Sequence, residues 1–153
     1  MPGPCGRLDA SYLIEHSIVH PSAPLNAAPP LKVLLVEDSA VLQERLRELL
    51  DHVPGIDLIA IVDSERAAVT ILRSIRIDVL LLDLHLKQGT GFGILRATAD
   101  LPRRAVTVVL TNFALPQYQR EAHALGVRYF LDKANEFDRI PDVLREVAET
   151  PAR

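Results

Sequence analysis

Residues 79–86 read Val-Leu-Leu-Leu-Asp-Leu-His-Leu, an apolar run that ends in a single carboxylate, Asp83. The first four residues are all apolar and show no polar alternation, which is typical of a strand buried on both faces of a parallel sheet. Asp83 then lies where the strand reaches the surface. The stretch therefore predicts an α/β fold in which a buried strand presents an acid at its carboxyl end.

Three other apolar runs are also followed by polar side chains that can take part in catalysis or ligand binding. They are residues 33–36 before Glu37 and Asp38, residues 106–110 before Thr111, and residues 129–131 before Asp132 and Lys133. In open α/β sheets the ligand crevice lies outside the carboxyl ends of the strands, so these strand ends are expected to share one edge. That edge would gather acids, a hydroxyl and an amine.

From Leu31 onward the chain alternates between short apolar runs and amphipathic segments, which indicates repeated β-α-β units. Strands are predicted at residues 32–36, 58–62, 79–82, 106–110 and 127–131. Ser39 and Ser64 are predicted to cap the helices after the first two strands, because their hydroxyls can accept free backbone N–H groups. Pro116 suits the first turn of a later helix, and Gly126 suits its end.

The inner faces of the helices are predicted from apolar residues at helical spacing. The residues expected to face the sheet are Leu42, Leu46, Leu49, Leu50, Ala68, Ile71, Leu72, Ile75, Ile140, Leu144 and Val147. Gly89, Gly91 and Gly93 are interpreted as a pliant loop before a helix that contains Ile94 and Leu95. No Gly-Lys-Ser or Gly-Lys-Thr follows these glycines, so they do not predict a phosphate-binding loop.

Length, charge and cysteine content exclude several classes of protein. The 153 residues, 48% of them hydrophobic, are enough for one domain with a core and too few for two of ordinary size. The net charge of −3 shows no excess of basic residues, which direct binding to nucleic acid or to an anionic membrane would require. Cys5 is the only cysteine, which excludes an internal disulfide and a cysteine zinc cluster. Since no apolar run nears the roughly 18 residues of a spanning helix and no secretory signal is evident, we expect no membrane insertion and a cytoplasmic location.

The chain is predicted to contain an N-terminal arm, one domain and a short tail. Residues 1–30 hold six of the eleven prolines, which predicts a Pro/Ala-rich arm outside the compact fold. Within it, residues 8–19 are apolar enough for a short helix that docks on the domain or supports a homodimer, although the composition favours an unstructured leader. The compact domain is expected over residues 31–148, followed by a tail at residues 149–153.

The acids at the shared strand edge point to metal-assisted phosphoryl chemistry. Glu37, Asp38 and Asp83 in one crevice would repel one another unless a cation joined them, and Mg²⁺ suits a set of oxygen ligands. An aspartate can act as a nucleophile and form an acyl phosphate, with Lys133 balancing the charge and the Thr111 hydroxyl donating to a phosphoryl oxygen. Each piece alone also has an ordinary structural reading. The Glu-Asp pair is typical of a solvated turn, the threonine of a strand-end cap and the lysine of a surface amine.

Four short motifs, in this order and spacing, resemble the receiver domain of bacterial two-component response regulators. They are Leu35-Val36-Glu37-Asp38-Ser39, Leu80-Leu81-Leu82-Asp83-Leu84, Val108-Val109-Leu110-Thr111 and Phe130-Leu131-Asp132-Lys133. The resemblance covers roughly residues 31–148. It implies a flavodoxin-like, doubly wound sheet of five parallel strands in the order 2-1-3-4-5, with five helices.

The same resemblance implies roles for individual residues. Asp38 and Asp83 would hold Mg²⁺, helped by Glu37 and the backbone carbonyl of His85. Asp83 would accept a phosphoryl group from a histidine kinase or a histidine phosphotransfer protein. Thr111 and Phe130 match the switch pair of the family, in which a moved hydroxyl and an inward-turned ring bias the surface of the fourth helix, fifth strand and fifth helix.

Several positions depart from the usual family pattern. Ala134 follows Lys133 where proline is common, so the resemblance does not determine the conformation of that loop. Lys87 replaces another common proline and is expected to face solvent, and Asn112 replaces a small residue. His85 and Phe113 fall at positions that border the attacking water in this family, and their bulk is expected to affect how long the phosphoryl group persists.

The leading hypothesis is a stand-alone phosphoacceptor module whose output is binding to an unknown downstream protein. On this hypothesis the chain is not an enzyme, beyond assisting its own phosphorylation and dephosphorylation. The alternative is a pseudo-receiver that keeps the fold and works without phosphate. An aspartate-nucleophile phosphatase is disfavoured because its second acid would be needed where His85 stands. Direct DNA contact is also disfavoured, since the chain lacks a helix-turn-helix segment.

Overall fold

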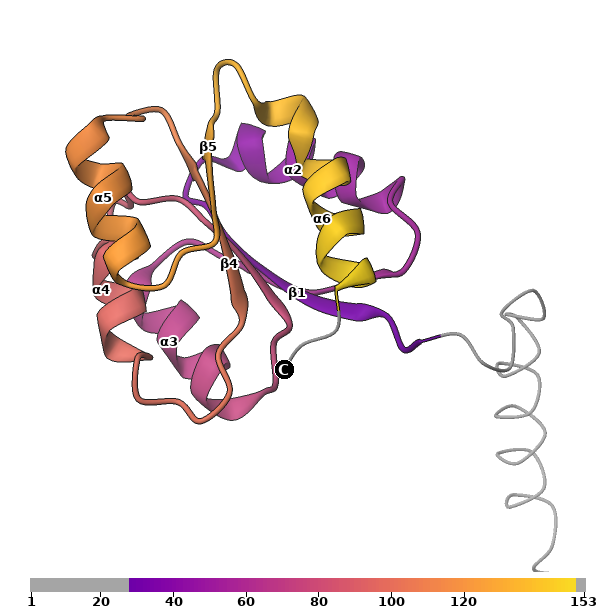
Figure 1. The fold of residues 1–153 in the computed structure, drawn as a ribbon, viewed down its shortest axis with the longest axis horizontal. Helices are drawn as coiled ribbons and strands as arrows, with labels where there is room; N and C mark the ends of the chain where they lie inside the picture. The colour runs from indigo at the N-terminus through magenta and orange to yellow at the C-terminus, as the bar shows by residue number, and fades with distance from the viewer. Residues whose placement is uncertain (1–27, 151–153) are drawn as a thin grey trace, which may run out of the picture.

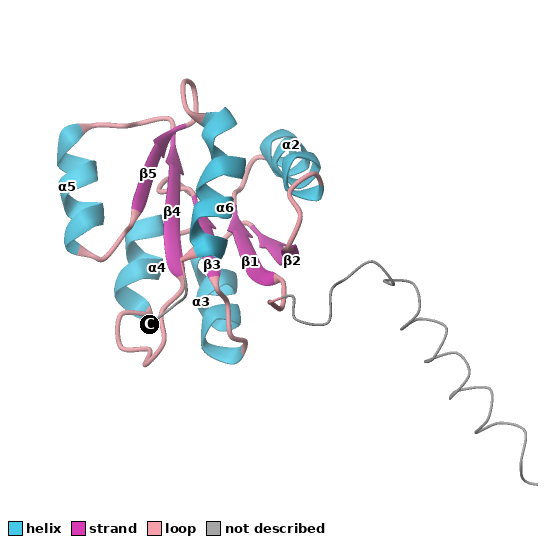
Figure 2. Cartoon of the chain, turned by 45° about the vertical axis from the view of Figure 1, so that its right-hand side comes forward, coloured by secondary structure: helices cyan, strands magenta, loops and turns pink. Residues whose placement is uncertain are grey.

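The computed structural model describes residues 28–150. Within them, five parallel strands form one sheet in the order β2-β1-β3-β4-β5 (Figure 1, Figure 2). The strands are β1 (Leu31–Val36), β2 (Ile56–Val62), β3 (Val79–Leu82), β4 (Val106–Thr111) and β5 (Tyr129–Asp132). The predicted class, strand order and flavodoxin-like topology are thereby confirmed. The helix predicted within residues 8–19 lies outside the described residues, and the domain limits of 31–148 stay a prediction.

Five α-helices of the described chain cover the two faces of this sheet. They are α2 (Ala40–Asp51), α3 (Glu65–Ser74), α4 (Gly91–Ala97), α5 (Pro116–Ala124) and α6 (Ile140–Glu149), the last preceded by a 3₁₀ turn at Phe137–Arg139. Helices α2 and α6 lie on one face, and α3, α4 and α5 lie on the other (Figure 1). The sheet is therefore doubly wound, as predicted.

Strand β3 lies in the middle of the sheet, and all four of its side chains are buried. Val79 and Leu81 pack into the core beneath α2 and α6, while Leu80 and Leu82 pack into the core beneath the other three helices. An apolar residue is needed at every position because both faces are covered. This confirms the interpretation of the unbroken apolar run.

The two predicted serine caps are present. The Ser39 hydroxyl accepts the N–H of Leu42 at 3.4 Å, and the Ser64 hydroxyl accepts the N–H of Ala67 at 3.2 Å. Pro116 opens α5, and Gly126 follows the end of that helix with a φ of 91°, which glycine adopts without strain. The sequence signals for helix starts and ends were thus correct at these positions.

Replacing Ser64 by alanine is expected to lower the free energy of unfolding by about 1 kcal/mol, because the Ala67 N–H loses its acceptor. Replacing it by glycine should cost only a few tenths of a kcal/mol, since glycine tolerates the cap conformation and leaves the N–H open to water. Urea unfolding followed by circular dichroism measures both. Equal losses in the two variants would show that the hydroxyl does not act as a cap.

Some predicted details were wrong. Ile75 is 43% exposed, because it follows the last residue of α3 in an extended conformation and so leaves the inner face of the helix. Gly91 and Gly93 belong to α4 rather than to a loop before it. A side chain at Gly91 would overlap the backbone of Asp83 and Leu84, so the close approach of α4 to this segment explains the glycine. Strand β5 begins at Tyr129, two residues later than predicted, because the Val127 N–H donates to the end of α5.

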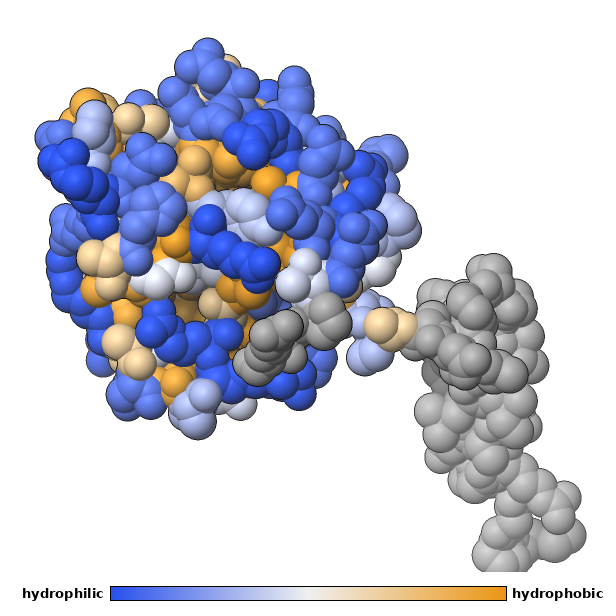
Figure 3. All heavy atoms as spheres, viewed as in Figure 1, coloured by the Kyte–Doolittle hydropathy of each residue, from blue (hydrophilic) through white to orange (hydrophobic). Residues whose placement is uncertain are grey.

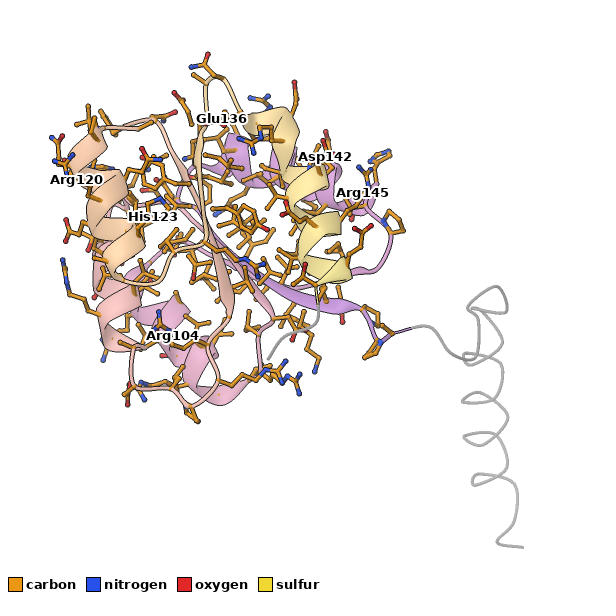
Figure 4. All side chains as sticks on the ribbon, in the orientation of Figure 1. Arg104, Arg120, His123, Glu136, Asp142 and Arg145 are labelled. Carbon is orange, nitrogen blue, oxygen red and sulfur yellow. The ribbon has the colours of Figure 1, made fainter. Side chains whose placement is uncertain are left out.

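The outer surface is mainly polar. Figure 3 shows hydrophilic side chains over most of the visible face, with apolar ones mostly in the gaps between them. Charged side chains of the outer helices, such as Arg120 on α5 and Arg145 on α6, point away from the sheet (Figure 4). No helix among residues 28–150 combines the length and apolar character required to cross a membrane.

Candidate functional site

The polar residues singled out in the sequence lie at one edge of the sheet. Glu37 and Asp38 directly follow β1, Asp83 follows β3, Thr111 ends β4 and Lys133 follows β5. Because all the strands are parallel, their carboxyl ends meet at the same edge (Figure 2). The structure thus brings these side chains to the edge where the sequence pattern predicted them.

A buried lysine lies between two buried acids at the centre of this edge. Lys133 Nζ is 2.5 Å from Glu37 Oε1 and 2.9 Å from Asp83 Oδ2. Only 9% of Lys133, 2% of Glu37 and 7% of Asp83 are exposed. Buried charges are stable only when they are paired and hydrogen-bonded. These contacts exclude the alternative in which Lys133 is a surface amine.

Burial and pairing also shift the proton equilibria of this group. Burial raises the pKa of Glu37 above its ordinary value, in spite of hydrogen bonds from Lys133 and from the Ser39 N–H that lower it. For Lys133, burial alone would lower the pKa, but the hydrogen bonds to Glu37 and Asp83 outweigh it and raise the pKa above the usual lysine value. Lys133 therefore carries a positive charge throughout the neutral range.

Backbone hydrogen bonds hold the two acidic loops against each other. The Lys87 N–H donates to Asp38 Oδ2 at 2.7 Å, and the His85 N–H donates to Asp83 Oδ1 at 3.1 Å. The Asp83 N–H donates to the Val36 carbonyl at 3.1 Å. Lys87 is exposed, as predicted for its side chain, and contributes to the site through its backbone.

The three acids form a set of ligands suited to a hard cation. One carboxylate oxygen from each of Glu37, Asp38 and Asp83 lies within 4.8 Å of the others. Oxygen-only donor sets of this kind match the preference of Mg²⁺. The residues present therefore fit the metal predicted from the sequence. The role of the His85 carbonyl as a further ligand stays a prediction.

Thr111 and Phe130 lie on the same side of the sheet. Thr111 is fully buried, and its hydroxyl accepts the N–H of Phe113 at 3.0 Å, which is the strand-end cap of the alternative reading. Phe130 is half-buried and lies opposite Val109, and alternation along β4 puts Thr111 on the same face as Val109. Thr111 and the Phe130 ring therefore lie on the same face of the sheet, the one that α5 covers.

Aromatic side chains border the site beside Asp83. The His85 ring lies 4.7 Å from the Phe113 ring and 5.7 Å from the Tyr118 ring, measured between centroids. The two positions expected to border the attacking water are therefore in contact with each other. The Lys133–Ala134 bond is trans, like every peptide bond in residues 28–150, and the Ala134 N–H donates to Asp132.

No sequence pattern pointed to Glu65, which the structure places at the far end of the segment that follows Asp83. Its carboxylate accepts the N–H of Thr90 at 2.9 Å. The sequence held only an indirect signal. Thr90 is the N-cap residue of α4, and Gly93, three residues later, has no side chain that could accept the Thr90 N–H. The partner comes from another helix, so sequence spacing could not identify it.

The chain is similar in sequence to known signalling proteins. A family model for the response regulator receiver domain matches residues 33–145. The nitrate/nitrite response regulator protein NarP of Escherichia coli is 30% identical over 129 residues, which cover 82% of this chain and 57% of NarP. A protein-glutamate methylesterase/protein-glutamine glutaminase of Anaeromyxobacter dehalogenans is 34% identical over 105 residues, which cover 68% of this chain and 30% of that protein. The chain thus spans little more than half of the first relative and less than a third of the second.

Solved structures share the fold at low sequence identity. A DNA-binding response regulator of the LuxR family from Staphylococcus aureus matches with a TM-score of 0.71 and 18% identity, over 77% of this chain and 98% of that one. The response regulator domain of Thermotoga maritima CheB matches with a TM-score of 0.69 and 18% identity, over 80% and 99%. With the family match and the sheet order, these likenesses lead to one conclusion: the chain belongs to the response regulator receiver domain family.

Proposed function

We propose that this chain is a phosphoacceptor module of a two-component or phosphorelay system, and that Asp83 accepts the phosphoryl group from a histidine kinase or a histidine phosphotransfer protein. The observation that carries the proposal is the buried Lys133 between Glu37 and Asp83. A purely structural ion pair needs one acid, whereas this lysine contacts two and a third lies beside them. Such a cluster is costly to bury, which favours a functional reason for it.

The proposed reaction uses the residues in the following roles. A carboxylate oxygen of Asp83 attacks the phosphorus, an O–P bond forms, and the N–P bond of the donor phosphohistidine breaks as its imidazole takes up a proton from solvent. Lys133, already 2.9 Å from Asp83, pairs with the negative charge carried by the phosphoryl group. The Thr111 hydroxyl keeps its proton for donation while it accepts the Phe113 N–H.

Magnesium would be held by Asp38 and Asp83, with Glu37 and the His85 carbonyl assisting. When bound, it supplies positive charge that offsets the repulsion between the carboxylates and the incoming phosphoryl oxygens. The backbone donations of Lys87 to Asp38 and of His85 to Asp83 orient these carboxylates.

The proposed output is a change of the surface formed by α5, β5 and α6, read by a downstream protein in the cytoplasm. A shift of Thr111 toward the phosphoryl group frees space on the face that it shares with Phe130, and the half-buried ring can turn into that space. The chain is proposed to act on no substrate apart from its own Asp83.

The proposal is tested by incubating the full chain with acetyl phosphate and Mg²⁺ and measuring its intact mass. We expect the addition of one phosphoryl group, and no addition when EDTA replaces Mg²⁺. An established receiver domain in a parallel reaction shows that the donor is active. If that control is labelled while this chain is not, the pseudo-receiver alternative replaces the proposal.

Replacing Asp38 by asparagine is expected to weaken Mg²⁺ binding at least about tenfold, because one of three anionic ligands loses its charge. Asparagine keeps the size and the oxygen that accepts the Lys87 N–H, so the loop geometry should persist. Titration calorimetry with MgCl₂ measures the change. Asp63→Asn, an exposed acid after β2 at the same edge, is the matched control; equal effects in both variants would place the metal elsewhere.

A further inference from the structure

Helix α4 begins with an incomplete capping box. Its own residues make only one of the two reciprocal hydrogen bonds of that motif. The Thr90 hydroxyl accepts the N–H of Gly93 at 2.9 Å, as the first half of a capping box does. In a complete box the residue at the Gly93 position is Glu or Gln, which accepts the N–H of the cap residue in return. Glycine cannot do so. The structure supplies that acceptor from another helix, because Oε2 of Glu65, the first residue of α3, accepts the Thr90 N–H at 2.9 Å.

Two glycines leave the space that the Glu65 side chain occupies. A Cβ at Gly93 would overlap the Glu65 carboxylate, and a Cβ at Gly89 would overlap both the carboxylate and the Glu65 Cβ. Gly89 also has a φ of 89°, which other residues rarely adopt. The glycines and Glu65 are therefore complementary in shape.

The backbone at the start of α3 adds to this anchor. The Glu65 N–H donates to the Gln88 carbonyl at 3.0 Å, and Ser64 forms an isolated parallel bridge with Gln88. Together with the Thr90 contact, these interactions fix residues 88–90 to the first turn of α3. The segment 83–90 is thus held at one end by β3 and at the other by Glu65.

The anchored segment carries the contacts that orient the acids. The Lys87 N–H, one residue before the Gln88 anchor, donates to Asp38, and the His85 N–H donates to Asp83. Gly89, near the end of this segment, adds to the conformational entropy that is lost on ordering, and the contacts made by Glu65 offset part of that loss. We infer that Glu65 is a positioning residue, which completes the cap of α4 from α3 and so holds the Lys87 and His85 amides against Asp38 and Asp83. Its effects on phosphorylation and on Mg²⁺ binding rest on the proposed function; its effect on the amides does not.

The test replaces Glu65 in the full chain by alanine or glutamine. In Glu65→Ala, hydrogen exchange of the Thr90 and Lys87 amides should accelerate about fivefold, the equivalent of losing one cap, and Mg²⁺ binding should weaken by a similar factor. Glu65→Gln keeps an acceptor oxygen and should retain most of the protection. Arg66→Ala, an exposed neighbour on the same helix, should leave both amides unchanged.

The decisive measurement is rescue by a second substitution. Gly93→Glu in the Glu65→Ala background rebuilds the capping box within α4 and should restore the protection of Thr90 and Lys87 and the affinity for Mg²⁺. Gly93→Glu alone should disturb the site, because two carboxylates then compete for one space. If Glu65→Ala does not fold, Glu65→Asp, shorter by one methylene, provides the same readout.

Unchanged exchange at Thr90 and Lys87 in Glu65→Ala would overturn the inference, and so would the absence of rescue by Gly93→Glu. Neither result depends on whether the chain accepts phosphate. If the wild type fails to take up phosphate while the amide effects appear, the proposed function is wrong and the positioning role of Glu65 still holds.

Discussion

Replacing Asp83 by asparagine is expected to reduce phosphoryl incorporation from acetyl phosphate to background. An amide is not a nucleophile toward phosphorus, so the variant lacks the atom that forms the new bond. Asparagine has nearly the same size and keeps an oxygen for the His85 N–H, so the loss does not arise from a changed loop. Intact mass after incubation with Mg²⁺ measures the incorporation directly.

The control for this prediction is Asp63→Asn, which removes an exposed acid that follows β2 at the same edge of the sheet. It should incorporate phosphate like the wild type. Incorporation into Asp83→Asn at the wild-type level would identify a different acceptor, with Asp38 the next candidate because it belongs to the same group of acids.

Replacing Lys133 by methionine is expected to lower the free energy of unfolding by about 3 kcal/mol in buffer without divalent cations. Methionine fills similar space, but Glu37 and Asp83 are left buried without the charge that both contact. Removing one partner of a buried ion pair is costly because the remaining charge is uncompensated. Mg²⁺ should restore part of the loss by taking over that charge. Urea unfolding with and without MgCl₂ measures both effects.

The Lys133→Met loss should shrink as the pH falls. Burial already raises the pKa of Glu37 in the wild type, and removal of the lysine takes away contacts that lower it. When folding raises the pKa of a carboxyl, the ionised form of that carboxyl destabilises the folded state. The destabilisation by Glu37 therefore grows above its unfolded pKa of about 4.5 and fades below it. Lys87→Met, an exposed lysine in the same region, should stay within about 0.5 kcal/mol of the wild type at every pH. Equal losses in both lysine variants would contradict the role of the buried pair.

The strands and the polar residues at their ends could be predicted from the sequence because both depend on local patterns. A run such as Val79–Leu82 has no alternative to burial on both faces, and the residue that follows it lies at the carboxyl edge of the sheet. Ser39 and Ser64 act on N–H groups three residues away, so their effect is visible in the sequence as well. Predictions failed where an element ended, as at Ile75, since the conformation of a terminal residue is set by the turn that follows and not by the periodicity of the helix.

The sequence by itself therefore determined the class of fold, the order of its elements and the residues that meet at the carboxyl edge of the sheet. Only the tertiary structure decided how these residues are joined: that Lys133 is buried between Glu37 and Asp83, which lie 96 and 50 residues away along the chain. It also decided that Glu65 caps a helix other than its own. The physical reason is that periodicity and capping act over a few residues, whereas pairing of buried charges and the fit of a side chain against glycines depend on distances that exist only once the sheet and helices have packed.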